Sequence, residues 1–352
     1  MPNFKAEALS DFIRRIFEAA GVPTEDAATV AGSLVGSNLR GHDSHGVMRV
    51  PQYVEFLEKG NYRVDVDLRV ESETPALMVC DGQWGLGQVQ AHRLVGLILP
   101  KAREVGLAAG LARDLGHVGR LGEYAERATD VGMVMLATVN NCGAGQRVAP
   151  PGGLGPRLGT NPLCIGAPTS TDSLVLDFGT SVAAEGKVRV HHINQTPTPE
   201  GWLLDAEGHP TTDPGVLYEH PPGSIMPMGG AQTYKGFGLA LLLDLLAGGL
   251  TGGRSSHPSA GPVRGNNLVV VVFDPSRLGL AEHLRDESST MTSYVRATPR
   301  LPGVESITLP GDPERRTLAE RSRTGIPLAA AHWERLTELA TRLSVATISS
   351  EA

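Results

Sequence analysis

Cysteine is scarce in this sequence, and its distribution argues against a disulfide framework. Three cysteines are present among 352 residues, at Cys80, Cys142 and Cys164, and no C-x-x-C pair occurs. An odd number of widely separated cysteines is typical of a protein from a reducing compartment. We therefore expect no disulfide bonds and a cytoplasmic location.

Long runs of positive charge and of apolar residues are also lacking. The formal net charge is -7 and no basic cluster is present, which disfavours nucleic-acid binding because phosphate neutralisation needs clustered Lys and Arg. The N-terminal segment MPNFKAEALSDFIRRIF has no apolar run of the signal-peptide type, and no uninterrupted apolar stretch has the length of a membrane span. The sequence thus predicts neither a nucleic-acid nor a membrane partner.

The remaining composition is that of a globular protein. Hydrophobic residues make up 41% and charged residues 20% of the chain, as in ordinary globular domains. A chain of this length is expected to form two or three domains. The 43 glycines indicate tight turns or close approach of the backbone to a ligand.

Helical periodicity predicts helices at both ends of the chain. Thr24 is expected to cap the second helix, Asp43 to cap a short helix that begins at Ser44, and Pro51 to open the helix that follows. The predicted helices cover residues 5–21, 25–39, a short segment from 44, 51–59 and 328–345.

Between these helices, short apolar runs typical of strands appear. No helix-length segment separates the runs at 163–168 and 174–178, and parallel strands need such crossovers, so we expect a mixed or antiparallel sheet. The apolar segment 236–253 is predicted to be a helix whose middle is buried, and 192–232 to form long loops. The other predicted elements are strands at 76–82, 107–113, 133–139 and 267–274 and helices at 86–106 and within 116–132.

No Rossmann dinucleotide fingerprint is present. That fingerprint needs G-x-G-x-x-G between a strand and a helix. GLGQVQ (85–90) lacks the third glycine, GLGPRLG (153–159) follows no predicted strand, and GHVGRLG (116–122) has the spacing G-x-x-G-x-x-G. The helix start after this last segment could still hold an anion.

The polar stretch RGHDSHGVMRV, which begins at Arg40, allows several interpretations. A zinc site on His42 and His45 lacks a motif for a third ligand, and a Ser44–His45 hydrolase lacks a G-x-S-x-G elbow. A solvated, capped helix start explains only part of the stretch. His45 and Arg49 are four residues apart on one predicted helix face, where they suit a carboxylate beside an oxygen that gains or loses a proton.

Further polar groups lie at predicted strand ends. His117 stands between glycines where a strand meets a helix, and Lys235 opens the apolar helix, where it could meet a phosphate or be solvated. Polar, glycine-bearing loops at 140–145, 159–162 and 177–181 complete this set. Together they indicate several ligand-binding loops around one sheet.

Six segments resemble, in order, the signature blocks of the malate/L-lactate dehydrogenase family of non-Rossmann NAD(P)-dependent oxidoreductases. They are RGHDSHGVMRVPQYVEFLEKG, GHVGRLGEYA, LGTNPLCIGAPT, LDFGTSVAAEGKV, GWLLDAEGHPTTDP and GGAQTYKGFGLALLLDLLAGGLTGG. The resemblance covers nearly the whole chain, including ITLPGDPE (307–314). The family includes malate, lactate, sulfolactate and ureidoglycolate dehydrogenases and reductases of cyclic imino acids, so the resemblance identifies no single substrate.

The resemblance implies an α/β fold in which a mixed, mostly antiparallel sheet forms a non-Rossmann cofactor-binding domain beside a helical domain built from both chain ends. We assign the helical domain to residues 1–74 joined by 305–352. The cofactor domain is assigned to 75–304, with a helical insertion at about 233–265. The resemblance also implies NAD or NADP as cofactor and a homodimer whose active site is shared between subunits.

Carried over residue by residue, the resemblance assigns catalytic, substrate-binding and cofactor-binding roles. His117 is the expected proton acceptor, with His45 and Ser44 beside it. The residues expected to contact the substrate are Arg49, Tyr53 and Thr160, and those expected to contact the cofactor are Asn141, Asp177, Phe178, Gly179, Thr180, Lys235 and Gly311. No metal is expected.

One departure bears on the reaction. Lys187 stands about where some imine-reducing members carry an aspartate that orients the Ser-His pair. This departure argues against imine reduction and against a relay role for Ser44 and His45. The sequence therefore predicts reversible hydride transfer between NAD(P) and a small 2-hydroxy acid of the malate or lactate type. The alternatives are a reductase of cyclic imino acids, a metal-dependent hydrolase using the HDSH cluster and a non-catalytic binding protein. Arg189 could meet the 2'-phosphate of NADP or be solvated.

Overall fold

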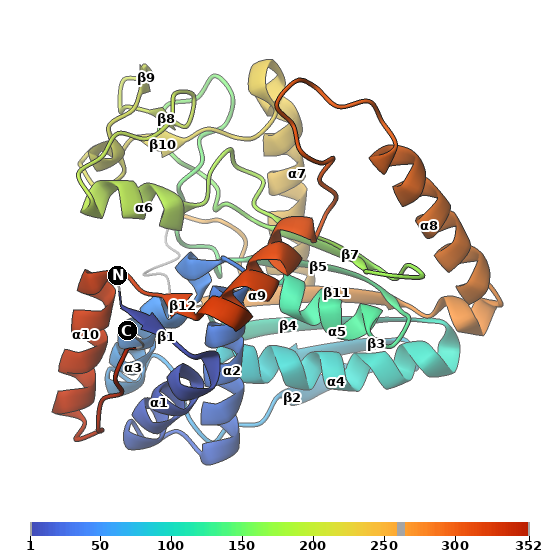
Figure 1. Ribbon diagram of the computed structural model, residues 1–352, viewed down its shortest axis with the longest axis horizontal. Coiled ribbons are helices and arrows are strands. Elements are labelled where there is room, and N and C mark those ends of the chain that lie inside the picture. The colour runs from blue at the N-terminus through green and yellow to red at the C-terminus, as the bar shows by residue number, and fades with distance from the viewer. Residues whose placement is uncertain (1, 259–264, 351–352) are drawn as a thin grey trace.

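A seven-stranded sheet forms the centre of the computed structural model, which describes residues 2–258 and 265–350 (Figure 1). The strand order is β2-β3-β4-β11-β5-β6-β7, and each neighbouring pair is antiparallel except β3 with β4. The strands are β2 (Arg69–Glu73), β3 (Leu77–Asp81), β4 (Leu107–Gly116), β5 (Val134–Asn140), β6 (Leu163–Ala167), β7 (Leu174–Phe178) and β11 (Gly265–Phe273). The expectation of a mixed, mostly antiparallel sheet is confirmed.

The lengths of the connections explain this topology. β3 and β4 are joined by the long helix α4 (Gly87–Val105), which gives the chain room to return in the same direction. The link between β6 and β7 is too short for such a crossover, so these strands run antiparallel. β11 is the apolar strand predicted at 267–274, and it pairs with β4 on one side and β5 on the other.

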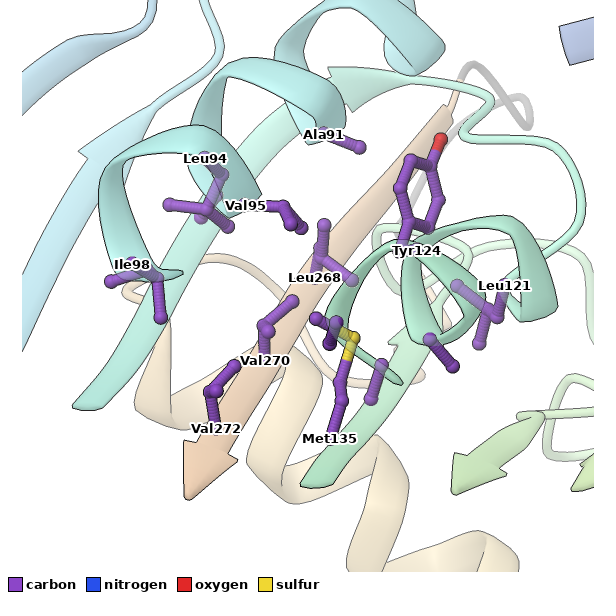
Figure 2. Packing of buried hydrophobic residues seen from close by; sticks show 14 of the residues in the cluster. Ala91, Leu94, Val95, Ile98, Leu121, Tyr124, Met135, Leu268, Val270 and Val272 are labelled. Atoms are coloured by element: carbon purple, nitrogen blue, oxygen red, sulfur yellow. The ribbon is translucent and has the colours of Figure 1, made fainter. Parts of the chain in front are cut away.

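One face of the sheet packs under α4 and α5 (Gly122–Thr129). Alternate residues of β11, Leu268, Val270 and Val272, are fully buried there, as expected for a strand with one face toward each layer. Figure 2 shows these side chains pointing toward residues of α4, among them Leu94 and Val95. The helix α7 (Thr233–Leu245) lies on the opposite face of the sheet (Figure 2).

Both ends of the chain build a second hydrophobic core. Helices α1 (Ala6–Ala19), α2 (Thr24–Leu39), α3 (Val50–Glu58) and α10 (Ala330–Arg342) surround it, and β1 (Asn3–Phe4) pairs with β12 (Ile326–Pro327). The ring of Trp333 lies 4.2 Å from that of Phe4 and 5.6 Å from that of Phe12. The two termini accordingly lie close together in Figure 1. The division into domains at residues 74 and 304 stays a prediction.

Two expected helix caps are wrong. Pro23 rather than Thr24 is the N-cap of α2, and no side chain caps that helix. The segment after α2 is not a helix from Ser44 but two 3-10 turns, η1 (Asp43–His45) and η2 (Val47–Arg49). The Asp43 carboxylate caps neither turn; instead it accepts from Asn38 at 2.6 Å and pairs with Arg321 at 2.7 Å. The extended backbone at Gly46 separates the two turns.

The apolar helix near residue 240 is more exposed than expected. α7 continues into a π-helical segment, η5 (Leu246–Leu250). The expected burial of its middle is wrong, because this helix covers the sheet with one side and carries a row of exposed leucines on the other. They are Leu241, Leu242, Leu245, Leu246 and Leu250. By length and composition alone, the helical stretch Gly230–Leu250 could also cross a membrane, and 33% of an 18-residue stretch within it is buried.

Several elements were not predicted from the sequence. Helix α6 (Glu185–Ile193) precedes the expected loops at 192–232, and those loops contain a small antiparallel sheet of β8 (Leu203–Leu204), β9 (Pro210–Thr211) and β10 (Ser224–Ile225). The helices α8 (Ala281–Arg296) and α9 (Asp312–Thr324) were also missed. The three cysteines are free thiols, as expected.

Candidate active site

The two turns after α2 are held in place by Asn38. Its Oδ1 accepts the N–H of Val47 at 2.8 Å, while its amide donates to Asp43. A Cβ atom on Gly46 would come within 2.2 Å of Asn38 Oδ1, so this position has no room for a side chain. Val47 and Val50 are fully buried in the core formed by the chain ends. The segment that carries the candidate residues is therefore anchored on both of its turns.

A cavity of about 220 Å³ lies where these turns meet the end of the sheet. It brings together residues that are far apart in the sequence and were singled out there: His45, Arg49, His117, Asn141 and Thr160 all line its wall. Further residues on the wall include Gln52, Tyr62, Arg147, Glu185, Arg189 and Asn266. Residues of the two turns, of the segments after β4 and β5 and of helix α6 thus line one cavity.

His117 follows directly after β4 and is held by two tyrosines. Its backbone N–H donates to the Tyr62 hydroxyl at 2.9 Å, and the Tyr53 hydroxyl oxygen lies 2.6 Å from its ring nitrogen Nδ1. The other ring nitrogen, Nε2, has no hydrogen-bond partner among the described residues. Because the ring lines the cavity, Nε2 is the atom available to a bound molecule.

The ring of His45 is stacked near that of His117 on the neighbouring wall. The two ring centroids are 5.5 Å apart, with an interplanar angle of 24°. The hydroxyl of Ser44 lies 3.0 Å from Nδ1 of His45. A Cβ on Gly186 of α6 would be 2.9 Å from the Cβ of Ser44, so α6 packs closely against this pair. A molecule in the cavity can therefore meet two imidazoles at once.

Both imidazoles are neutral at physiological pH. Burial, together with the Arg49 charge, lowers the pKa of His45 to about 3. Burial, together with the charges of Arg49 and His45, lowers the pKa of His117 well below its ordinary value. A neutral imidazole can accept a proton, which an imidazolium cannot do.

Arg49 carries a positive charge and has no carboxylate partner among the described residues. Its Nε donates to the carbonyl oxygen of Ser44 at 2.7 Å, and its Nη1 donates to Gln52 Oε1 at 3.0 Å. These bonds fix the guanidinium plane while leaving N–H groups free. Arg147, on the same cavity, likewise has no acidic partner in residues 2–258 and 265–350; its guanidinium lies 6.0 Å from the ring of Tyr218. Two cations thus face one small cavity.

Arg189 differs because α6 itself neutralises it. Its Nε and Nη2 donate to Glu185 Oε1 at 3.1 and 2.8 Å, one helical turn away. The hydroxyl of Tyr218 donates to the same carboxylate oxygen at 3.1 Å. This pair sits on the cavity wall. No local pattern predicted that Arg189 would line the same cavity as His45, because α6 was not predicted.

Tyr53 lies behind His117 rather than on the cavity wall. Its side chain is 1% exposed, and its hydroxyl points to His117. Burial raises the pKa of Tyr53 to about 12, so its hydroxyl keeps its proton. Tyr53 was expected to contact the substrate, but it is not among the residues that line the cavity.

Of the residues expected to bind the cofactor, only Asn141 lines the cavity. Asn141 lines the cavity, and Thr180 lies just behind it, where its hydroxyl donates to the carbonyl oxygen of Thr160 at 3.0 Å. The partly buried Asp177 carboxylate instead accepts the N–H of Gly122, at 2.7 Å, at the start of α5. The others lie outside the cavity in the described part of the chain: Phe178 at the end of β7, Gly179 beside Thr160, the exposed Lys235 at the start of α7, and Gly311 before α9.

The polar groups on the wall suit a nicotinamide. Asn266 donates to Asn141 Oδ1 at 3.3 Å and so orients that side chain. The Nδ2 group of Asn141 has no partner among the described residues and can donate to the oxygen of a carboxamide. Gly145 on the same wall has no side chain that would keep a flat ring away. The residues present therefore fit the cofactor implied by the sequence.

The HDSH cluster does not form a common metal site. His42 Nε2 lies 3.1 Å from Glu314 of α9, Asp43 pairs with Arg321, and His45 contacts Ser44. Three side chains of this short segment therefore have three different partners. Within the described residues, no group of three His, Cys, Asp or Glu has the arrangement of a metal site.

Solved structures of dehydrogenases share this fold. The structure of a putative malate/lactate dehydrogenase from E. coli superimposes with a TM-score of 0.91 at 33% identity, covering 98% of this chain and 96% of that chain. The Δ1-piperideine-2-carboxylate reductase from Pseudomonas syringae superimposes with a TM-score of 0.81 at 29% identity, covering 97% and 100%. The fold is therefore that of an oxidoreductase class without a Rossmann domain.

Sequence comparison identifies the family within this class. Hydroxycarboxylate dehydrogenase B from Escherichia coli O157:H7 is 34% identical over 348 residues, 97% of this chain and 95% of that protein. Malate dehydrogenase from Pyrococcus horikoshii is 34% identical over 346 residues, 96% of this chain and 95% of that protein. The model of the malate/L-lactate dehydrogenase family matches residues 4–337, and the chain belongs to this family.

Proposed function

We propose that the chain is an enzyme that oxidises a small 2-hydroxy acid reversibly to the 2-keto acid with NAD or NADP. The observation that carries this proposal is the meeting of two neutral imidazoles and an arginine without an acidic partner in one cavity. The family membership and the dehydrogenase relatives support it. When bound, the nicotinamide accepts or gives the hydride, and the protein positions the acid and moves the proton.

Arg49 binds the carboxylate of the acid. Its guanidinium is already fixed through Ser44 and Gln52, so it loses little conformational freedom when the substrate binds. The two Nη groups retain N–H donors, and a planar fork matches the two oxygens of a carboxylate. This contact places the 2-hydroxyl group beside the imidazoles.

His117 accepts the hydroxyl proton at Nε2 as the hydrogen on C2 leaves as hydride. Its lowered pKa keeps it neutral, as this step requires. His45, whose ring lies 5.5 Å away, holds the same oxygen or the carboxylate, with Ser44 orienting its ring. In the reverse direction, His117 returns the proton to the oxygen of the 2-keto acid.

Asn141 and the adjacent loops bind the cofactor in this proposal. Asn141 holds the carboxamide, and Thr160 lies between the substrate and the 177–180 loop. Asp177, Phe178, Gly179, Thr180, Lys235 and Gly311 form the rest of the proposed cofactor site. The active form is a cytoplasmic homodimer in which the exposed face of α7 meets the partner.

Arg147 favours an acid with a second anionic group. A monocarboxylate would occupy Arg49 and leave Arg147 without a negative partner in a cavity of about 220 Å³. Malate has a second carboxylate that can meet Arg147, whereas lactate has only a methyl group there. We therefore propose a malate-like substrate ahead of a lactate-like one.

A reductase of cyclic imino acids is the second candidate, because such a reductase shares the fold. One observation weakens it. Lys187, which stands about where some imine-reducing members of the family carry an aspartate, is exposed on α6 and lies outside the cavity wall. Ser44 bonds His45 and has no carboxylate partner among the described residues.

A spectrophotometric screen tests the proposal. Purified protein is offered malate, lactate and other 2-hydroxy acids with NAD or NADP, and the corresponding 2-keto acids and cyclic imino acids with NADH or NADPH. We expect oxidation of a 2-hydroxy acid that EDTA leaves unchanged. Turnover of cyclic imino acids alone would favour the second candidate, and hydrolysis abolished by EDTA would favour the metal-dependent alternative.

A further inference from the structure

A buried chain of hydrogen bonds runs from Gln88 to the ring of His117. The Nε2 group of Gln88 donates to the Tyr53 hydroxyl oxygen at 3.1 Å, and that oxygen lies 2.6 Å from His117 Nδ1. Gln88 is 0% exposed and Tyr53 is 1% exposed. The positions of the protons in this chain are therefore set by protein groups.

Close backbone packing places Gln88 behind His117. Gly87 opens α4, and a Cβ on Gly87 would lie 2.2 Å from the carbonyl oxygen of Gly116. The start of α4 is therefore pressed against the end of β4, where only glycine fits. The residue after Gly87 is Gln88, which thereby reaches the hydroxyl of Tyr53 on α3.

The direction of these hydrogen bonds decides which ring nitrogen of His117 carries a proton. Because the Tyr53 oxygen accepts from Gln88, its single proton is directed to Nδ1 of His117. The backbone N–H of Gly119 also donates to Nδ1, at 3.3 Å. A neutral imidazole that accepts at Nδ1 carries its own proton on Nε2. In this arrangement His117 presents an N–H to the cavity, which can hold a keto oxygen but cannot accept a hydroxyl proton.

The amide of Gln88 has a second end that is not used. Its Oε1 atom is buried and has no hydrogen-bond partner among the described residues. A half-turn of the amide exchanges Oε1 and Nε2, which have nearly the same shape. Oε1 of Gln88 would then accept the Tyr53 proton, and the Tyr53 oxygen would accept the Nδ1–H of His117 while the N–H of Gly119 loses its acceptor. Nε2 of His117 would present a lone pair to the cavity.

We propose that Gln88 is a positioning residue that determines, through Tyr53, which nitrogen of His117 carries the proton. The amide orientation described here makes His117 a hydrogen-bond donor to the keto acid. The reversed orientation makes it the acceptor during oxidation: the hydroxyl proton moves to Nε2, the C2 hydrogen leaves as hydride to the cofactor, and Tyr53 holds the Nδ1–H. This inference rests on the proposed function, because that function gives His117 the acceptor role.

No carboxylate is hydrogen-bonded to the ring of His117 in the described part of the chain. The ring is thus controlled through Tyr53 and the backbone of Gly119. The titratable and charged groups that face it from the packed elements and across the cavity are Arg49, His45, Tyr53, Tyr62, Arg147, Glu185 and Arg189. None of these is changed in the test below.

The test uses two variants of Gln88 and a matched control. Gln88→Met removes both ends of the amide, whereas Gln88→Glu keeps an acceptor for the Tyr53 proton. Gln90→Met is the control, because Gln90 is also buried in the first turns of α4, also makes one bond (to the Val66 carbonyl oxygen at 2.9 Å) and also has an Oε1 without a partner in the described residues. The whole protein is labelled with ¹⁵N-histidine, and NMR measures which ring nitrogen of His117 is protonated.

We expect Gln88→Glu to increase the fraction of His117 with its proton on Nδ1, and Gln88→Met to decrease it. In hydroxy-acid oxidation, Gln88→Met should lower kcat by about tenfold, and Gln88→Glu should retain kcat and shift the acid limb of the pH profile up by about one pH unit, which is the effect of one pKa unit on a protonation equilibrium. Gln90→Met should leave the protonated nitrogen and the pH profile unchanged.

The inference is overturned if both Gln88 variants keep the wild-type protonation of His117, or if they lose activity equally with an unchanged pH profile, as a structural role predicts. Failure of the proposed function looks different. In that case the wild-type protein would oxidise no 2-hydroxy acid, while the NMR comparison would still show whether Gln88 controls the ring of His117.

Discussion

At the scale of single residues, two similar histidines in one cavity have different surroundings. His117 is backed by a hydrogen-bonded tyrosine, and its Nε2 is free in the described structure, whereas His45 contacts a serine hydroxyl. The tyrosine contact fixes the ring of His117, and in the acceptor state proposed above the Tyr53 oxygen holds its Nδ1–H. This asymmetry is the reason for assigning proton transfer to His117 and substrate holding to His45.

Replacing His117 by alanine should therefore mainly affect the chemical step. We expect kcat for hydroxy-acid oxidation to fall by about 10²–10⁴-fold, the range typical of a positioned acid–base group. The Kd of NADH, measured by fluorescence, should change little. His45→Ala is the control and should mainly raise KM for the acid. If His45→Ala abolishes turnover while His117→Ala retains it, the two roles are reversed.

The pH dependence of oxidation should reflect the lowered pKa of His117. Oxidation needs the neutral imidazole, and its pKa in the folded protein lies well below 6.5. The rate should therefore stay level as the pH falls through 6.5 and decrease only at lower pH, as the imidazole is protonated. Arg49 contributes to the lowered pKa of His117, so Arg49→Gln should raise that pKa. As the pH falls, the residual activity of this variant should therefore begin to decrease at a higher pH than that of the wild-type protein. A decrease centred near 6.5 in the wild-type protein would contradict this prediction.

Arg49→Lys should weaken substrate binding more than cofactor binding. Lysine keeps the positive charge but loses the planar fork and the bonds to Ser44 and Gln52. The expected loss is about 1.5–3 kcal/mol, the value of a hydrogen bond to a charged group. The measurement compares KM for the 2-keto acid with the Kd of NADH. An equal increase in KM for the 2-keto acid and in the Kd of NADH would contradict the assignment of Arg49 to the substrate carboxylate.

At the scale of single elements, helix α7 carries the most unusual surface. Beyond its first turn its sequence is mostly apolar, and burial against the sheet accounts for only one side of the helix. The opposite side exposes a row of leucines, a feature that in soluble enzymes often marks contact with another chain. We therefore expect the proposed homodimer to bury this row.

Leu242→Glu should dissociate that dimer. Leu242 is 61% exposed in the single chain, so a charge there should cost little in the fold of the monomer but should be unfavourable in an apolar interface. Light scattering should show a monomer, and the dehydrogenase assay should show reduced activity. Leu278→Glu is the control. Leu278 is similarly exposed at 63%, but it lies in the 3-10 turn after β11, which contacts α4 on the other face of the sheet. A wild-type protein that is monomeric and fully active would contradict the prediction.

At the scale of the whole molecule, the active-site turns depend on a core shared by both ends of the chain. Val47 and Val50 flank Arg49 and pack in the same cluster as Phe12 of α1 and Leu336 of α10. Loss of packing near the C-terminus should therefore reach the substrate site, although it lies nearly 300 residues away in the sequence.

Trp333→Ala should test this connection. The tryptophan ring packs on Phe4 and Phe12, and its removal should lower the free energy of unfolding by about 3 kcal/mol, as for other large aromatic truncations. Urea unfolding followed by circular dichroism measures the change, and activity should be lost at the same urea concentration as structure. Glu334→Ala, on the exposed side of α10, is the control. A stable protein with unchanged activity would show that the chain ends are independent of the site.

Local sequence patterns determined much of what was predicted correctly. The periodicity of residues 5–21 and 328–345 is a property of neighbouring residues, and it predicted α1 and α10. The short link between the runs at 163–168 and 174–178 excluded a parallel crossover and so predicted the antiparallel sheet. The sequence also singled out His45, Arg49 and His117 by residue type and flanking glycines, and its ordered motifs indicated the family.

Only the tertiary structure decided how these residues meet. Gln88 belonged to a failed dinucleotide motif, and Arg147 and Glu185 had no local signal; each joins the site because distant segments approach closely, as Gly87 does to Gly116. The same is true of Asp43, which the local pattern made a helix cap but which pairs with Arg321, 278 residues further along the chain. The physical reason is that periodicity and capping depend on neighbours in the chain, whereas hydrogen-bond direction, burial and pKa depend on contacts between segments that no local pattern encodes.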